Sequence, residues 1–225
     1  MRPPGHHCGR DVSSGFCLLN NLAIATADVL SGSQPGSPQK VAIVDFDAHH
    51  GNGTEEIFWD QPQVGFFSLH QEGIYPGSGA IDEAPHARGR LLNLPLPAHA
   101  GDLALEQITG QVLWPWLRRF KPEMLFVSAG FDGHWSDPLA SLGFSTAGFF
   151  KLAASLAAMA DELCGGRVVF ILEGGYDPEA LENNVRAVLG ALSGQPEAPD
   201  SSGPSRYPEP DIRPRIDHLR KLHHL

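Results

Sequence analysis

The chain has 225 residues, of which 42% are hydrophobic and 19% charged, so it has the composition of one large globular domain rather than of a disordered or fibrous protein. Its formal net charge of −10 argues against direct binding to nucleic acid and favours a cationic partner, and no apolar run is long enough to predict a membrane span. Three cysteines are too few for a disulfide framework, and the first residues lack the apolar core of a secretion signal, so we expect a cytoplasmic protein.

The first periodic segment covers residues 16–30, where Leu19, Leu22 and Leu30 recur at helical spacing. Gly, Ser and Pro fill residues 31–38 and end this predicted helix. Short apolar runs rich in β-branched residues then recur along the chain, which is typical of strands buried on both faces of a parallel sheet. These predicted strands are Val41–Phe46, Val64–Leu69, Leu91–Leu94, Met124–Ser128 and Val168–Leu172.

Two helices are predicted in the last third of the main domain. Ser145 and Thr146 offer an N-cap to a helix whose apolar residues repeat on one face from Phe149 to Leu163. A second helix is predicted over Ala180–Leu192. The alternation of strands and helices predicts an α/β fold with a mainly parallel sheet, in which ligands bind beyond the carboxyl ends of the strands.

The C-terminal part of the chain has a different composition. Residues 193–210 contain five prolines, two glycines and four serines, which predicts a flexible linker between the main domain at 1–192 and a tail. The tail, 211–225, turns basic and is predicted to form a short amphipathic helix that packs back on the domain. We expect His223 and His224 to be exposed to solvent, and we expect His134 to lie in a surface loop.

The strongest chemical signal lies directly after the first predicted strand, within Val44–Gly53. Because side chains of a strand alternate between faces, Asp45, Asp47 and His49 would project to one side. The glycines that follow allow the backbone to turn. A polar turn capped by Asp and Asn is the alternative, but this density of carboxylates and imidazoles favours a metal site.

Asp132 follows another predicted strand and, taken alone, is a turn residue or a helix cap. Two strand ends of the same sheet bring their acids to the same edge, however. Asp47, His49 and Asp132 would then supply three protein ligands and leave positions open for water or substrate, as in a catalytic metal site. Zn²⁺ is expected first, and the two carboxylates leave Fe²⁺, Co²⁺ and Mn²⁺ as alternatives.

Two adjacent imidazoles, His6 and His7, lie in a proline-rich segment near the start of the chain. Asp45 and Asn52 are available as their partners. A histidine that bonds to a carboxylate favours the imidazolium form, whereas one that bonds to an amide keeps a pKa nearer 7 and can transfer protons. We therefore expect the two histidines to be chemically different.

The run Leu172–Tyr176 ends the last predicted strand with a Gly-Gly turn. Such turns are common and carry no chemistry by themselves. Beside a metal, however, this turn would bring the phenol of Tyr176 to the edge of the sheet, where it could donate a hydrogen bond to a developing oxyanion.

In combination, these motifs resemble the histone deacetylase family, in its class II and bacterial amidohydrolase branch. The matching segments follow the family's order over most of the main domain; they are Arg2–His7, Gly15–Asn21, Val44–Gly53, Ser68–His70, Tyr75–Gly79, Ser128–Asp132 with Asp137 and Pro138, and Leu172–Asp177. The resemblance implies a three-layer α/β/α fold of the arginase and deacetylase kind. Family members usually carry a long segment before Arg2, so we expect a sheet without its first strands, an exposed edge and a homo-oligomer.

The resemblance also implies roles for the residues singled out above. Asp47, His49 and Asp132 would hold the catalytic zinc. His7, beside Asn52, would be the general base, and His6, paired with Asp45, would be its more permanently charged partner. Tyr176 would polarise the amide carbonyl. The remaining implied sites are a substrate tunnel at Gly15, Phe16, Tyr75, Leu139 and Gly174, and a structural K⁺ site at Asp45, Asp47, His49, Ser68 and Leu69.

These roles lead to the expectation of a zinc-dependent hydrolase that removes acetyl or other acyl groups from lysine-like amines by activating water. Its substrate would be an acetylated lysine peptide or a small acetylated amine. The alternatives within the same fold are an acetylpolyamine amidohydrolase, an esterase and an arginase-like enzyme with two manganese ions. The alternative of another class is a catalytically weak module that binds acyl-lysine or a metal.

Overall fold

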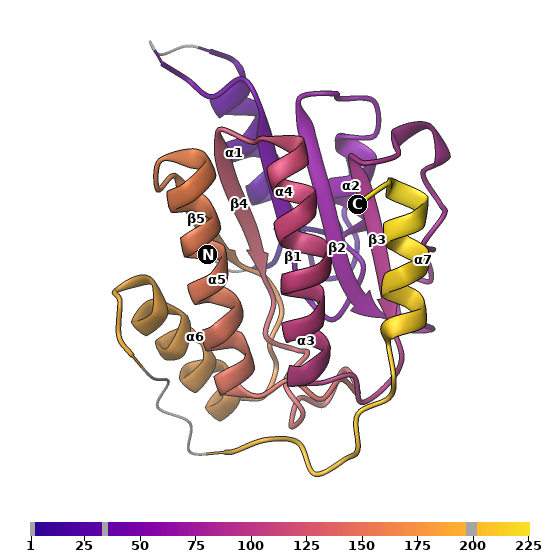
Figure 1. Cartoon of the computed structure of the whole chain (residues 1–225), viewed down its shortest axis with the longest axis vertical. Coiled ribbons are helices and arrows are strands. Elements are labelled where there is room, and N and C mark those ends of the chain that lie inside the picture. The colour runs from indigo at the N-terminus through magenta and orange to yellow at the C-terminus, as the bar shows by residue number, and fades with distance from the viewer. Residues whose placement is uncertain (1–2, 33–35, 197–201) are drawn as a thin grey trace.

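The computed structural model describes residues 3–32, 36–196 and 202–225; Arg2 and residues 197–201 of the predicted linker lie outside the described residues. The described residues form a five-stranded, fully parallel sheet in the order β3-β2-β1-β4-β5 (Figure 1). The strands are β1 (Val41–Asp45), β2 (Val64–Gln71), β3 (Leu91–Leu96), β4 (Met124–Ala129) and β5 (Val168–Leu172).

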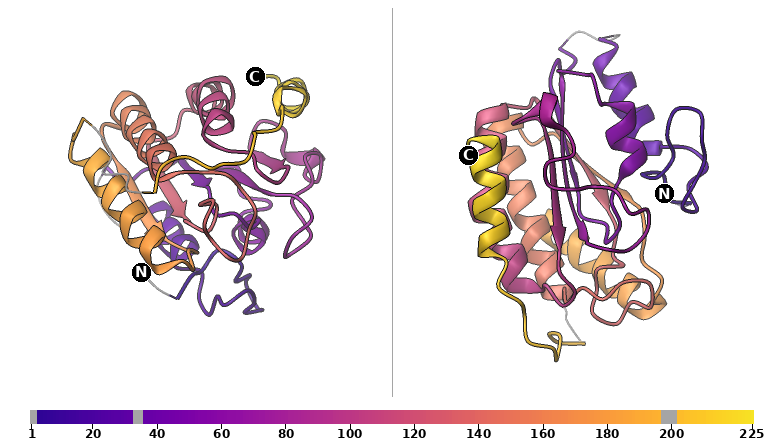
Figure 2. Two further views of the ribbon diagram at one scale, coloured as in Figure 1. Left: turned by 90° about the horizontal axis from the view of Figure 1, so that it is seen from below. Right: turned by 90° about the vertical axis from the view of Figure 1, so that its right-hand side faces the viewer.

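Helices cover both faces of the sheet. They are α1 (Asn21–Leu30), α2 (Asn52–Ile57), η1 (Pro85–Ala87), α3 (Asp102–Ile108), η2 (Thr109–Leu113), α4 (Trp114–Phe120), α5 (Thr146–Cys164), α6 (Pro178–Leu192) and α7 (Arg213–His223). In Figure 2, α1 and α2 lie on one side of the sheet and α3, α4, α5 and α7 on the other. The predicted three-layer α/β fold is therefore confirmed.

Strand β1 lies at the centre of the sheet and contributes to both hydrophobic cores. Val41 and Ile43 belong to the core under α1, while Ala42 and Val44 belong to the larger core under α3, α4 and α5. All five residues of the strand are buried. A continuous apolar run is the pattern expected for a strand that is covered on both faces.

The predicted strands agree with the structure, whereas some helix boundaries differ. The helix predicted from residue 16 begins only at Asn21, because the side chain of Asn20 accepts the N–H of Ala23 at 2.9 Å and caps the helix there. Ser145 caps α5 as expected, with its Oγ atom accepting the N–H of Gly148 at 3.1 Å.

The helical segment at 102–120 was not predicted from the sequence. The structure divides it into α3, η2 and α4, of which η2 is a π-helical turn. Gly110 and Pro115 interrupt the segment's helical pattern. Its helicity results from packing, because Leu105, Ile108 and Leu117 are buried against the sheet.

The tail packs on the main domain through its helix α7, whose Ile216 and Leu219 side chains are buried. Just before this helix, the carboxylate of Glu209 accepts the N–H groups of Gly101, Leu103 and Ala104 at 3.0–3.1 Å. A side chain distant in sequence thereby caps α3. No helix among the described residues has the length and apolar character needed to cross a membrane.

The expectation that three histidines are exposed is wrong for two of them. His224 is exposed, but His134 and His223 are each 1% exposed. His134 Nδ1 lies 2.9 Å from the Oγ atom of Ser136 in a tight turn. His223 Nδ1 accepts the N–H of Gly89 at 2.9 Å, which joins α7 to the loop before β3.

Candidate metal centre and active site

The predicted site residues lie at the carboxyl ends of three neighbouring strands. Asp45 is the last residue of β1, and Asp47 and His49 follow it directly. Asp132 follows β4, which pairs with β1 so that Asp45 lies opposite Ser128. The turn that begins at Glu173 follows β5, the next strand in the sheet. Parallel pairing therefore brings these separate segments to one edge.

Three candidate metal ligands converge at this edge. The ligand atoms of Asp47, His49 and Asp132 all lie within 4.8 Å of one another. His49 Nδ1 is 3.1 Å from Asp47 Oδ1 and 2.8 Å from Asp132 Oδ2. Both carboxylates are buried and His49 is half-buried, so the three donors face one small region of space. One imidazole and two carboxylates form a suitable ligand set for a divalent transition metal.

Main-chain N–H groups orient the two carboxylates. Asp132 Oδ1 accepts the N–H of Ala48 at 2.8 Å, and Asp47 Oδ2 accepts the N–H of Gly174 at 2.9 Å. Each carboxylate therefore has one oxygen fixed by the backbone and another directed towards His49. Outer hydrogen bonds of this kind fix the direction of metal ligands.

Two glycines allow the backbone to approach these carboxylates. A Cβ atom on Gly174 would lie 2.5 Å from Asp47 Oδ2 and 2.6 Å from Asp132 Oδ2. A Cβ atom on Gly130 would lie 2.0 Å from Asp47 Oδ2. Gly174, predicted as a substrate-binding residue, thus lies against the two carboxylates and is not part of the pocket lining described below.

The charges at this edge favour a cation between the carboxylates. Burial lowers the pKa of His49, but its hydrogen bonds to Asp132 and Asp47 outweigh burial and raise that pKa to about 10. Burial, and then the charge of Asp47, raise the pKa of Asp132 to about 7. Without a metal, a proton on His49 compensates these negative charges, so the three side chains fit a divalent metal that would replace that proton.

His6 and His7 lie beside the three ligands and contact different partners. His6 Nδ1 is 3.0 Å from Asp45 Oδ2, and its Nε2 atom is 3.6 Å from Asp47 Oδ1. His7 Nδ1 is 2.8 Å from the amide oxygen of Asn52. Since an amide oxygen only accepts, the proton of neutral His7 lies on Nδ1 and its Nε2 lone pair is free to accept a proton.

The pKa values of the two histidines are displaced in opposite directions. Burial lowers the pKa of His6, but the negative charges of Asp45 and Asp47 raise it well above its usual value. Burial, and then the charge of His6, lower the pKa of His7 to about 3. His6 is therefore the charged member of the pair and His7 the neutral one.

A pocket of about 440 Å³ opens directly over His7 and His49. Its lining includes all but one of the residues predicted for the substrate tunnel, together with the predicted catalytic tyrosine; they are Gly15, Phe16, Tyr75, Leu139 and Tyr176. The side chains of Phe16, Tyr75 and Leu139 are 71%, 48% and 45% exposed, which places them at the rim. Ile74 also lines the pocket and was not predicted.

Asp137 joins two walls of this pocket. Its Oδ1 atom accepts the N–H of Leu139 at 3.0 Å, and its Oδ2 atom accepts the N–H groups of Tyr176 and Asp177 at 2.7 and 3.2 Å. Asp137 stands out in the sequence only as part of a segment that resembles the family. Its role could not be predicted, because the carboxylate accepts only main-chain N–H groups, and no sequence motif marks such donors.

Two of the residues predicted for K⁺, Asp47 and His49, are also candidate metal ligands, and the other three lie in β1 and β2. Asp45 at the end of β1 pairs in register with Ser68 of β2, and Leu69 follows. Both Ser68 and Leu69 are buried. The main chains of β1 and β2 therefore run side by side at Asp45 and Ser68, two of the residues whose carbonyl groups are expected to bind K⁺.

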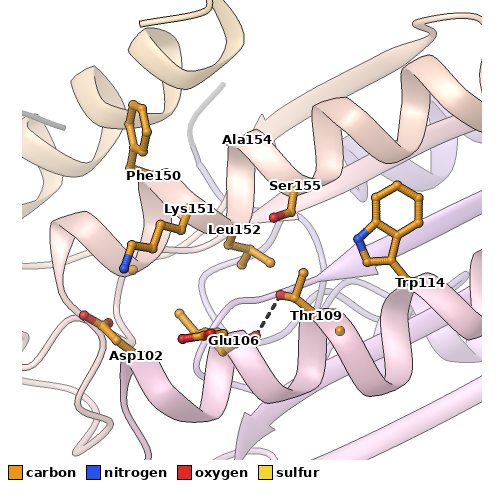
Figure 3. A pocket seen from close by; sticks show the side chains of 12 residues that line it. Asp102, Glu106, Thr109, Trp114, Phe150, Lys151, Leu152, Ala154 and Ser155 are labelled. Atoms are coloured by element: carbon orange, nitrogen blue, oxygen red, sulfur yellow. Dashed lines mark hydrogen bonds between the residues drawn. The ribbon is translucent and has the colours of Figure 1, made fainter. Parts of the chain in front are cut away.

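A larger hollow, of about 560 Å³, lies elsewhere, between α3, η2 and α5 (Figure 3). Trp114 and Lys151 line it, and Thr109 donates its hydroxyl to the carbonyl of Leu105 at 2.7 Å. None of the predicted site residues lines this hollow. The smaller pocket over His49 is therefore the better candidate for the chemistry.

Sequence and structure comparisons agree with this geometry. The histone deacetylase domain family matches residues 1–192. The chain belongs to the histone deacetylase family. Histone deacetylase 10, chloroplastic, of Oryza sativa subsp. japonica is 44% identical over 231 residues, which cover 100% of this chain and 52% of that protein. The chain thus spans about half the length of this relative.

Two solved structures extend the comparison to the fold. The crystal structure of the HDA15 HD domain aligns with a TM-score of 0.83 and 33% identity, covering 99% of this chain and 60% of that chain. An acetylpolyamine aminohydrolase from Burkholderia pseudomallei aligns with a TM-score of 0.75 and 35% identity, covering 86% of this chain and 55% of that chain. The arrangement of the sheet and its helices in this chain is therefore similar to that in both solved structures.

Proposed function

We propose that this chain is a zinc-dependent hydrolase that removes acetyl or other acyl groups from lysine-like amines. The observation that carries the proposal is the convergence of Asp47, His49 and Asp132 beneath a pocket whose wall also contains His7 and Tyr176. Membership of the histone deacetylase family supports it.

Asp47, His49 and Asp132 would hold the metal, with one oxygen of each carboxylate kept in place by a main-chain N–H. When bound, the metal supplies Lewis acidity, which lowers the pKa of water and polarises the substrate carbonyl. Zn²⁺ is our first choice because its catalytic sites keep three protein ligands and an open position. Fe²⁺, Co²⁺ and Mn²⁺ suit the same donors.

His7 is proposed as the general base and later the general acid. Its Nδ1 proton is committed to Asn52, so Nε2 is the atom that would take a proton from water and return it to the leaving amine. His6, kept charged by Asp45, would act through its electrostatic field on the developing negative charge. The proton transfer would therefore belong to His7 alone.

Tyr176 is proposed to donate its phenolic O–H to the carbonyl oxygen as negative charge develops there. One such donor contributes on the order of 10²–10³ in rate. Its ring lies 6.1 Å from that of Phe16, centroid to centroid, so it stands at the pocket wall near the rim. Asp137 would hold this residue in place through the N–H of Tyr176.

The rim favours a long aliphatic chain that ends in an amide. Phe16 and Tyr75 are proposed as aromatic walls for the methylene groups of acyl-lysine, with Gly15 and Leu139 beside them. The ring of Tyr75 packs edge-on against that of His7, with centroids 4.9 Å apart, so the aromatic wall would extend to the proposed base. The formal net charge of −10 suits a substrate with positive charges outside the tunnel.

The direct test is hydrolysis of an acetyl-lysine peptide by this polypeptide after removal and return of zinc. We expect turnover that a chelator abolishes and zinc restores. A His7→Ala variant should lose that turnover by at least two orders of magnitude because it lacks the base. Binding of the peptide with no turnover in the zinc-loaded chain would instead favour a module that only binds acyl-lysine.

A second candidate is hydrolysis of small acetylated amines. The structural likeness to an acetylpolyamine aminohydrolase and the acidic net charge favour it. Parallel assays with acetyl-lysine peptide, acetylspermidine and an aryl acetate would separate deacetylase, polyamine hydrolase and esterase activities. A higher kcat/KM for acetylspermidine than for the peptide would assign the chain to polyamine substrates.

We also propose a structural K⁺ ion at Asp45, Asp47, His49, Ser68 and Leu69. The parallel register of β1 and β2 supports it, since it brings the main chains at Asp45 and Ser68 together. The test is thermal unfolding in K⁺ compared with Na⁺ and a large organic cation. We expect a higher Tm in K⁺, and equal Tm values in all three salts would exclude the site.

The assembly, compartment and domain limits are proposals as well. We propose self-association along β5, because Val169 on this strand is 38% exposed and β5 has a single strand partner among the described residues. A purely monomeric profile in size-exclusion chromatography would contradict it.

We also propose a cytoplasmic location. All three cysteines lie in the described part of the chain and are buried and unpaired, which is typical of a reducing compartment. We propose a catalytic domain at 1–192, a linker at 193–210 and a helical tail at 211–225.

A further inference from the structure

Glu173 is a fully buried carboxylate to which the sequence motifs assign no role. It follows the last residue of β5, and its exposed fraction is 0%. Its main-chain N–H donates to the carbonyl of Ala129 at 3.0 Å, so its backbone is fixed to the end of β4. A buried carboxylate is costly unless strong donors surround it. The donors that Glu173 has therefore indicate what it does.

Those donors come mainly from the segment that carries the two histidines. Glu173 Oε2 accepts the N–H of Gly5 at 2.6 Å and the N–H of His6 at 3.1 Å. Glu173 Oε1 accepts the hydroxyl of Ser128 at 3.2 Å. Two consecutive main-chain groups of the histidine segment are thus held by one carboxylate from a distant part of the chain.

The next residue connects Glu173 to the metal ligands. The N–H of Gly174 donates to Asp47 Oδ2 at 2.9 Å. One dipeptide therefore holds the histidine segment with a side chain and a candidate metal ligand with its backbone. This dipeptide therefore connects the segment that carries the proposed base to a candidate metal ligand.

We propose that Glu173 is a positioning residue that sets His7 relative to the metal ligands. This inference rests on the proposed hydrolase function. Glu173 does not line the substrate pocket, so we assign it no contact with substrate. Its effect would pass through the main chain of Gly5 and His6 to His7. Displacements of about 1 Å at a reacting group can cost on the order of 10² in rate.

The test compares three variants with the wild-type chain. Glu173→Gln keeps an oxygen acceptor for the two N–H groups, Glu173→Ala removes it, and Ser128→Ala removes only the third contact. We expect Glu173→Ala to lower kcat about 10²-fold with KM within about threefold of wild type. Glu173→Gln and Ser128→Ala should keep kcat within about threefold. If Glu173→Ala does not fold, Glu173→Asp, whose shorter side chain draws the acceptor back, replaces it.

A second readout does not depend on activity. Hydrogen exchange at the amides of Gly5 and His6 should become faster in Glu173→Ala and stay slow in the Gln and Ser128→Ala variants. Bound zinc per chain should be the same in all four proteins. Unchanged kcat and slow exchange in Glu173→Ala would overturn the proposal, as would a raised KM with unchanged kcat. Absence of turnover in the wild-type chain would overturn the hydrolase function, while the exchange rates would still decide whether Glu173 holds the segment.

Discussion

The imidazoles of His6 and His7 lie 4.1 Å apart, centroid to centroid, but their Nδ1 atoms bond to a carboxylate and to an amide, respectively. Asp45 keeps His6 charged, whereas burial and the charge of His6 keep His7 neutral. The two adjacent residues can therefore divide the work, one as a fixed positive charge and the other as a proton carrier. The neutral amide of Asn52 adds no negative charge that would favour a proton on His7.

Replacing Asn52 with Asp should raise the pKa of His7, because a carboxylate stabilises the imidazolium form. The proposed base would then be protonated up to a higher pH. We expect the acidic limb of the kcat/KM profile against pH to move upward by about 1 unit. Asn183→Asp, which adds the same charge on α6, is the control and should leave the limb in place. A limb that does not move in Asn52→Asp would remove His7 from the base role.

Replacing Tyr176 with Phe should reduce kcat about 10²–10³-fold and change KM by no more than a few fold. The reason is that the phenolic O–H is proposed to act on the transition state rather than on the bound substrate. Tyr207→Phe is a matched control, since Tyr207 is 60% exposed and stacks on His99 away from the pocket. Steady-state kinetics decides the matter, and a raised KM with normal kcat would contradict the proposed role.

Gly174→Ala should abolish metal binding without unfolding the chain. The added Cβ atom would lie 2.5 Å from Asp47 Oδ2 and 2.6 Å from Asp132 Oδ2, so one of the carboxylates must move. Gly190→Ala is the control, because its Cβ atom would meet only the flexible end of Gln195. Zinc content per chain and Tm should be measured for both variants. Full zinc binding by Gly174→Ala would mean that these carboxylates do not hold the metal.

The strands and the metal ligands were predictable from sequence for one physical reason. A strand covered on both faces is continuously apolar, as Val41–Val44 is, so its end is marked by the first charged residue. Parallel strands end at the same edge, so Asp47 and Asp132 had to lie close together. The ligands converge because the sheet is parallel, and the apolar runs in the sequence predict that sheet.

The supporting contacts were not predictable in the same way. Asp137, Glu173 and Glu209 bond to main-chain N–H groups, which every residue type except proline carries. No side-chain pattern marks such a partner. The same limit explains the error at His223, whose partner is the N–H of Gly89. The segment 102–120 was missed because tertiary packing outweighs its weak helical pattern.

His223 should make the stability of the chain depend on pH. Burial, and then the charges of Arg88 and His224, lower the pKa of this neutral histidine to about 4. In the unfolded chain the pKa is about 6.5, so the unfolded state binds more protons between pH 6.5 and 4. The stabilisation is therefore present above pH 6.5 and is lost as pH falls towards 4, by roughly 3 kcal/mol in total.

The measurement is urea denaturation from pH 7.5 to 4.5 for the wild type and for His223→Asn, in which the amide oxygen can accept the N–H of Gly89. We expect the free energy of unfolding to fall more steeply in the wild type by about 2–3 kcal/mol over this range. Parallel curves for the two proteins would show that His223 is not buried in its neutral form.

The most direct test of the whole account is the metal content of the zinc-reconstituted chain, measured by elemental analysis on the wild type and on Asp47→Ala and Asp132→Ala. We predict one zinc per wild-type chain and none in either variant, because both carboxylates and His49 are needed to hold it. Two metals per chain would indicate arginase-like chemistry instead. Wild-type zinc content in the Asp132→Ala variant would contradict the proposed centre.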